Sequence, residues 1–134
     1  MPEVFAQYEE ATIKAFVVRE RRDRFLTLLP NPKHRHKVTA SLAHPNPGWF
    51  DARYVKPIPP AQSSKESIAR ILLSKGAGDV CWAISEDRKL DGREFELELV
   101  LAEVVGSGMG TILCCIPAKL AFVESEVGRF ILEK

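Results

Sequence analysis

The chain has 134 residues, of which 46% are hydrophobic and 28% are charged. This is the size and composition of one globular domain with its own hydrophobic core, so an intrinsically disordered chain is excluded and no disulfide or metal staple is required. No apolar run approaches the roughly 18 residues of a membrane span, and the N-terminus has no secretion-signal pattern. We therefore expect a cytoplasmic protein with no membrane partner.

The charge is divided unevenly along the chain. Residues 1–60 hold 10 Lys and Arg against 6 Asp and Glu, a net charge of +4, whereas residues 61–134 hold 9 against 12, a net charge of −3. This asymmetry permits an anionic partner for the N-terminal half without requiring one.

The N-terminal 44 residues carry a helical pattern. Apolar residues recur at helical spacing from about Val4 to Leu29, which predicts one long helix or two helices with a break near Arg21. The segment 30–32 (Pro-Asn-Pro) ends this pattern, and a second helix is predicted over 32–43. A proline-rich turn over 44–48 follows, which we interpret as a loop within one domain of residues 1–134.

A sheet-forming unit is predicted over 52–134. Residues 52–58 favour a strand, but Pro57 limits it to an edge or a strand end. Ser63 and Glu66 match a capping box for a helix that ends near Gly76.

Two short apolar runs, 80–85 and 111–116, lack the alternation of a half-exposed strand and are typical of strands buried on both faces. The stretch between them fits both a strand and a helix, and we interpret it as a short extended segment at 93–95 followed by a helix over 97–105. Residues 120–124 form a hairpin return, and 130–132 add a last edge strand.

The predicted fold class is therefore α/β, with N-terminal helices packed on a β-α-β-α-β-β unit. Because right-handed crossovers join parallel strands, we expect a mixed, mainly parallel sheet of four or five strands.

This fold predicts a ligand site at the carboxyl ends of the parallel strands. Carboxylates there can hold Mg²⁺ while a cation faces a phosphate, as phosphoryl chemistry needs. The candidate ligand-binding residues are Ser85, Glu86, Asp87, Asp91, Arg93 and Lys119. The simpler alternative is a polar, solvated loop.

Two other motifs suggest chemistry but have simpler explanations. The glycine-rich stretch 106–110 follows a predicted helix and precedes a strand, the reverse of the order that a phosphate-binding loop needs. The three cysteines lie in predicted strands and are expected to be reduced core residues, with Cys115 the best candidate for a nucleophile. No cofactor and no metal site is predicted.

A basic run crosses the N-terminal helices. The candidate nucleic-acid-binding residues are Arg21, Arg24, Arg35 and Lys37. Glu20 and Asp23 interrupt the run, and a solvated helix face is the favoured alternative. The adjacent aromatic residues Trp49 and Phe50 are interpreted either as a plug that closes one end of the core or as part of a binding patch.

Three functions remain as hypotheses. The first is a non-enzymatic protein-interaction or regulatory binding module, which contacts itself or another protein through the N-terminal helices or through Trp49 and Phe50. The second is a small enzyme or binding protein for a phosphorylated or nucleotide-like ligand, and the third is nucleic-acid binding by the basic helices. No motif decides between an enzyme and a binding protein.

Overall fold

The computed structural model describes residues 5–43, 49–126 and 128–134. The N-terminal part contains η1 (Phe5–Glu10), α2 (Ala11–Phe16), α3 (Arg19–Leu28), α4 (Arg35–Thr39) and η2 (Ala40–Ala43). The remainder contains η3 (Ala52–Tyr54), β1 (Val55–Pro57), η4 (Pro60–Gln62), α5 (Lys65–Ser74), β2 (Val80–Ser85), β3 (Arg93–Glu96), α6 (Leu97–Val104), β4 (Thr111–Ile116), β5 (Leu120–Ser125) and β6 (Gly128–Glu133). The predicted helix start near Val4 and the predicted turn over 44–48 lie outside the described residues.

The sheet corrects the predicted fold class. It has six strands in the order β1-β6-β5-β4-β2-β3, and every neighbouring pair is antiparallel. The prediction of a mainly parallel sheet of four or five strands was therefore wrong. In particular β2 and β4, predicted to be parallel neighbours, pair antiparallel with Ser85 opposite Thr111.

The cause of this error is the short strand β3. The segment at 93–95 was interpreted as a mere extended lead into a helix, but it forms a strand that pairs with β2 and reverses the chain. Helix α6 therefore connects β3 to β4, which run in the same direction but have β2 between them. Strands β3 and β4 are thus parallel to each other but not neighbours, and each hydrogen-bonded pair of strands is antiparallel.

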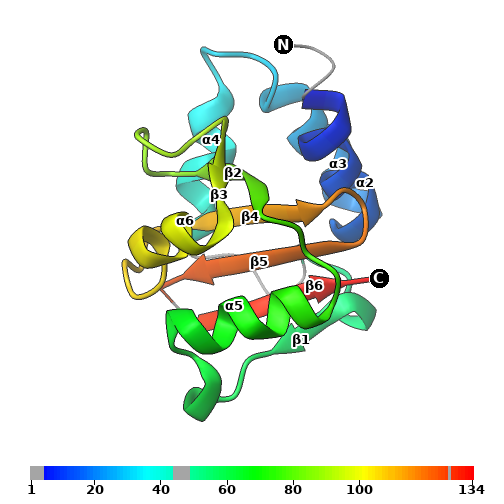
Figure 1. Cartoon of the computed structure of the whole chain (residues 1–134). Helices are drawn as coiled ribbons and strands as arrows, with labels where there is room; N and C mark the ends of the chain where they lie inside the picture. The colour runs from blue at the N-terminus through cyan, green and yellow to red at the C-terminus, as the bar shows by residue number, and fades with distance from the viewer. Residues whose placement is uncertain (1–4, 44–48, 127) are drawn as a thin grey trace.

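Helices cover both faces of this sheet (Figure 1). Helices α5 and α6 pack on one face, where Ile68, Leu72, Leu101 and Phe122 form a buried cluster with their neighbours. The N-terminal helices pack on the other face, and their core includes Phe16. The result is three layers with the sheet in the middle.

Strand β4 shows why the apolar runs lack alternation. Leu113 and Cys115 face the α5 and α6 layer, whereas Ile112 and Cys114 face the N-terminal helices. Both sets are buried because each face has its own helical cover. The prediction that these strands are buried on both faces is confirmed.

Local capping explains the limits of α5. The hydroxyl of Ser64 accepts a hydrogen bond from the N–H of Ser67 (3.2 Å), so Ser64 is the N-cap rather than the predicted Ser63. Gly76 has a φ of +105°, a left-handed conformation that suits glycine after the last turn. These caps fix the helix end that leads into β2.

Candidate functional site

The reversed strand directions divide the residues of the predicted ligand site. Ser85 ends β2, and Glu86, Asp87 and Asp91 lie in the loop that leads to Arg93 at the start of β3. Lys119 lies in the turn between β4 and β5, at the opposite end of the sheet, because β4 runs antiparallel to β2. The structure therefore brings five of the six predicted residues to one end and leaves Lys119 at the other.

The first residues of this loop are used for internal hydrogen bonds. The buried hydroxyl of Ser85 bonds to the Thr111 hydroxyl at 2.8 Å and accepts a hydrogen bond from the N–H of Asp87 at 3.0 Å. The carboxylate of Asp87 accepts a hydrogen bond from the N–H of Lys89 at 3.0 Å. Such short-range bonds are typical of a turn that holds its own shape.

Asp91 belongs to a partly buried ionic cluster that the sequence did not reveal. The guanidinium of Arg35 donates to Asp91 through Nε (2.6 Å) and Nη2 (2.8 Å). It also donates to Glu9 through Nη1 (2.7 Å) and Nη2 (2.8 Å), and from Nη1 to the carbonyl of Leu29 (3.2 Å). These five bonds use all five N–H donors of an arginine.

The carboxylates of this cluster have further partners. Glu9 is only 1% exposed and accepts a hydrogen bond from the indole Nε1 of Trp82 at 2.6 Å. Asp91 accepts one from the N–H of Ser85 at 3.0 Å. Burial alone would lower the pKa of Arg35, but its hydrogen bonds to Asp91 and Glu9 outweigh burial and raise that pKa. The cluster ties η1, α4 and the β2–β3 loop together, and Arg35 has no donor left for a phosphate.

The other predicted cations remain on the surface. Arg21 and Arg24 on α3 and Lys37 on α4 are exposed, and none of the three has an ion-pair partner among the described residues. Of the four residues predicted to contact nucleic acid, the structure thus leaves three accessible and encloses Arg35.

The aromatic pair takes the position of a plug. Phe50 is 5% exposed and packs against Phe130 at a centroid distance of 5.6 Å. Trp49 is half-buried and packs edge-on against Phe25 at 5.7 Å. Both rings close the core below the N-terminal helices, which is the first of the two interpretations offered for this pair.

The three cysteines are free and buried. Burial raises the pKa of Cys81 and of Cys114 to about 12, and it also raises the pKa of Cys115. The Sγ of Cys114 accepts a hydrogen bond from the hydroxyl of Thr12 at 3.2 Å. A thiol in such surroundings is almost entirely protonated at neutral pH, so these positions lack the thiolate that a nucleophile needs.

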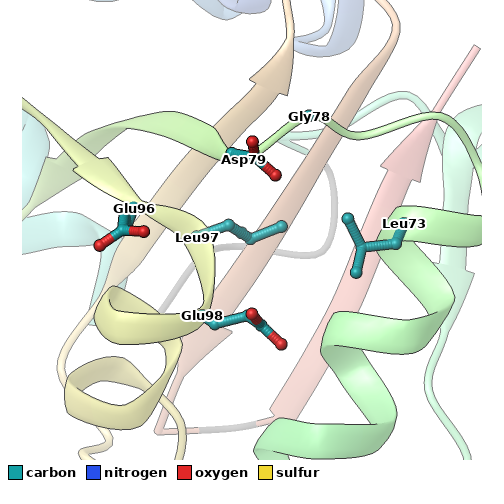
Figure 2. A pocket seen from close by; sticks show the side chains of 6 residues that line it. All are labelled: Leu73, Gly78, Asp79, Glu96, Leu97 and Glu98. Carbon is teal, nitrogen blue, oxygen red and sulfur yellow. The ribbon is translucent and has the colours of Figure 1, made fainter.

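A pocket that the sequence did not predict lies between α5 and the start of α6. Leu73, Gly78, Asp79, Glu96, Leu97 and Glu98 line it. Figure 2 shows Leu73 and Leu97 pointing toward each other across the space, with the carboxylates of Asp79 and Glu98 directed into it and that of Glu96 directed away. The N–H of Leu97 donates to the carbonyl of Asp79 at 2.8 Å and joins the two segments.

The pocket combines negative charge with accessible apolar surface. Leu73 is 43% exposed, and Leu99, on the outer side of α6, is 66% exposed. Within the described chain, no ion pair or side-chain hydrogen bond neutralises Asp79 or Glu98. From Glu94 to Ala118 the sequence contains four acidic residues and no basic one. In the sequence, this acidic run indicates a negatively charged surface, but only the structure of α6 shows which of its carboxylates reach the pocket.

The size of the pocket limits what it can hold. Its volume is about 60 Å³, whereas pockets for cofactors and drug-sized ligands have roughly 300–1,000 Å³. The end of one long side chain fits this space, and a nucleotide does not. In the described part of the chain, no three His, Cys, Asp or Glu side chains gather where they could hold a metal ion.

The fold and this site define a three-layer α/β domain with an antiparallel sheet and a small acidic pocket. No protein-family model, curated protein or solved structure matches the chain. Across residues 5–43, 49–126 and 128–134, no helix combines the length and the apolar composition needed to cross a membrane.

Proposed function

We propose that the protein is a non-enzymatic binding module that holds a protein partner by inserting one of the partner's arginine or lysine side chains between α5 and α6. The observation that carries this proposal is the position of two carboxylates, Asp79 and Glu98, which have no partner among the described residues and flank a small pocket with apolar walls. The partner segment is basic, with apolar residues beside the inserted side chain.

The chemistry of a long basic side chain matches this pocket. Its aliphatic stem packs on apolar surface while its charged end stays near polar groups. Leu73 and Leu97 provide the apolar walls, and the carboxylates of Asp79 and Glu98 accept charge-assisted hydrogen bonds. Leu99 offers exposed apolar area for a neighbouring side chain of the partner.

The walls of the pocket are rigid enough for such recognition. Leu73 lies in the last turn of α5, which is capped at both ends, and Leu97 begins α6 directly after β3. Gly78 and Asp79 form the third wall, and the hydrogen bond from the N–H of Leu97 to the carbonyl of Asp79 holds it against the start of α6. A site on regular elements needs little rearrangement on binding, which favours a direct docking contact.

The phosphorylated-ligand hypothesis has less support. Asp91 already accepts two hydrogen bonds from Arg35, and Lys119 lies at the far end of the sheet. For the compartment we keep the cytoplasm, because free buried thiols suit a reducing environment.

The test is an NMR titration of the full chain with a short acetylated peptide that alternates leucine and arginine. We expect amide shifts to concentrate at Leu73, Gly78 and Leu97. The double variant D79N/E98Q should weaken binding roughly tenfold, since two exposed ion pairs of up to about 1 kcal/mol each are lost.

The matched control is E103Q, which removes a charge from the same helix outside the pocket. A peptide with glutamate in place of arginine should not bind. Equal affinity of D79N/E98Q and the unaltered protein for the arginine peptide, or shifts that spread over the N-terminal helices instead, would contradict the proposal.

A further inference from the structure

We infer that the partner is a second copy of this chain, whose helix α3 docks over the pocket and inserts the end of one arginine side chain into it. This inference rests on the proposed function, because it names the partner's segment that docks on the pocket, a basic segment with an apolar residue beside its arginines. The contact is head-to-tail, because the basic surface of one molecule meets the acidic pocket of the next.

Helix α3 presents a stripe of the required composition. Arg21, Arg24 and Leu28 follow each other at spacings of three and four residues, so they lie on one side of the helix. The two arginines are exposed, and Leu28 is partly exposed at the edge of the core, which Phe25 and Leu29 enter fully. The stripe extends over roughly 10 Å at 1.5 Å per residue.

The stripe and the pocket are complementary in kind. One arginine of the stripe enters between Asp79 and Glu98, the other lies at the rim of the pocket, and the exposed part of Leu28 faces the exposed part of Leu73. In the described residues, no ion pair engages Arg21 or Arg24. Arginine suits this contact because its planar fork binds a carboxylate through two hydrogen bonds.

The charge of the two regions supports the same pairing. From Arg19 to Lys37 there are 7 basic and 2 acidic residues, a net charge of +5, while the run from Glu94 to Ala118 has a net charge of −4. Opposite fields of this kind bring two surfaces together and suppress like-charged orientations.

The fold determines the symmetry of the contact. Helix α3 belongs to the layer on one face of the sheet, whereas α5 and α6, which border the pocket, belong to the layer on the other face (Figure 1). One molecule therefore cannot fill its own pocket, and each bound copy leaves one free stripe and one free pocket. Such a heterologous contact produces chains of molecules or a ring rather than a closed symmetric dimer.

The contact is weak and salt-dependent, because it depends on charges at the surface, which salt screens over about 8 Å at physiological ionic strength. We expect self-association at low salt and high protein concentration. The association constant should fall by roughly tenfold or more when salt is raised well above physiological strength.

The deciding experiment is sedimentation equilibrium of two variants, alone and mixed. R21Q/R24Q keeps the acidic pocket but loses the stripe, and D79N/E98Q keeps the stripe but loses the pocket. Each variant alone should remain monomeric under conditions in which the unaltered protein associates. An equimolar mixture should form a 1:1 dimer that does not grow, because one functional stripe and one functional pocket remain.

A variant with R19Q and K33Q, which removes two exposed cations outside the stripe, serves as the matched control and should self-associate like the unaltered protein. A mixture that stays monomeric while the unaltered protein associates overturns the head-to-tail contact. An unaltered protein that stays monomeric at every salt concentration also overturns this inference, even if the leucine–arginine peptide still binds the pocket and so leaves the proposed function intact.

If the unaltered protein does not bind the leucine–arginine peptide, both proposals are wrong. A third outcome would show that the stripe binds nucleic acid instead. In that case the unaltered protein is monomeric and binds a 20-nucleotide RNA with an affinity that falls steeply with salt, and R21Q/R24Q reduces this salt dependence. The inference of self-association would then be wrong.

Discussion

The ionic cluster of Glu9, Arg35 and Asp91 and the acidic pocket of Asp79 and Glu98 use the same chemical groups in opposite ways. In the cluster each carboxylate is bonded to one guanidinium and to at least one further N–H, and Glu9 is almost fully buried. In the pocket both carboxylates face solvent without a partner in the described residues. Charge that is buried and fully bonded holds segments together, whereas charge left unpaired at a surface is available for a partner.

Glu124 is a second buried carboxylate with all its bonds inside the protein, as in the ionic cluster. It is 1% exposed, accepts hydrogen bonds from the N–H groups of Gly106 (3.1 Å) and Gly108 (3.2 Å), and pairs with the Nε of Arg129 at 2.6 Å. The glycine-rich loop thus folds around a carboxylate of its own chain. This agrees with the sequence-based rejection of a phosphate-binding loop.

Replacing Arg35 with Met should produce the largest effect. The substitution leaves Glu9 and Asp91 close together without their cation, and breaking a buried pair in this way costs about 3–5 kcal/mol. Urea denaturation followed by circular dichroism measures the loss. The control R24M removes an exposed arginine and should change stability by no more than about 0.5 kcal/mol. Similar losses in both variants would mean that the cluster is not a structural tie.

Replacing Glu124 with Gln should have an intermediate effect. The amide still accepts one hydrogen bond, but the charge-assisted bonds to Arg129 and the loop N–H groups weaken, which we expect to cost about 1–2 kcal/mol. The same urea experiment measures it, with E103Q as the exposed control. Hydrogen exchange at Gly106 and Gly108 should accelerate in E124Q, and unchanged exchange would argue against the role of Glu124 in holding the loop.

The double variant D79N/E98Q tests the other half of the comparison. Its stability should remain within about 0.5 kcal/mol of the unaltered protein, because exposed unpaired charges contribute little to folding. Its affinity for the leucine–arginine peptide should fall roughly tenfold in the same sample. A large loss of stability would show that these carboxylates are structural and would remove the contrast with the cluster.

The thiols report whether loss of the cluster loosens the core. A pKa of about 12 for Cys81 and Cys114, against 9.0 for an unperturbed thiol, leaves roughly a thousandfold less thiolate at pH 8. Alkylation of the folded protein should therefore be slow and should proceed through unfolding. R35M should react faster than the unaltered protein, and equally fast alkylation of native and urea-unfolded protein would contradict the burial of the thiols.

The smallest effect concerns an exposed pair, Asp51 with Arg53. Hydrogen bonds from Arg53 lower the pKa of Asp51 from 3.8 to about 2. Because the folded pKa is the lower one, the charged form favours folding, and its contribution is present above pH 3.8 and is lost as the pH falls toward 2. Melting temperatures of the unaltered protein and D51N should differ above pH 4 and converge near pH 2. A difference that grows on acidification would reverse this sign.

The strand limits at 80–85 and 111–116, and the start of α5, which was predicted one residue too early, show which features were accessible to local reasoning. A serine next to an apolar helical stripe, and short runs of β-branched and apolar residues, act within a few positions of the chain. The same reasoning gave α6 within one residue of its end and placed an edge strand at Pro57, although the first predicted residues of that strand, 52–54, form η3. These features follow from nearest-neighbour chemistry, so the sequence is sufficient for them.

The direction of the strands was not accessible in this way. Whether β4 runs parallel or antiparallel to β2 depends on whether the four residues of β3 pair with β2, and those four residues fit more than one conformation. The candidate ligand site was derived from the wrong direction, which is why Lys119 lies apart from Asp91. An error in one short strand thus moved a whole predicted site.

The sequence alone determined the local elements, the burial of the strands on both faces and the uneven distribution of charge. Only the tertiary structure decided what each charge does. Arg35 and Arg24 look alike in the sequence, but Arg35 meets Asp91 from 56 positions away and Glu9 from 26, while Arg24 faces solvent. The physical reason is that secondary structure follows from bonds between near neighbours, whereas the partner of a charged side chain is set by distant segments brought together by the burial of apolar surface.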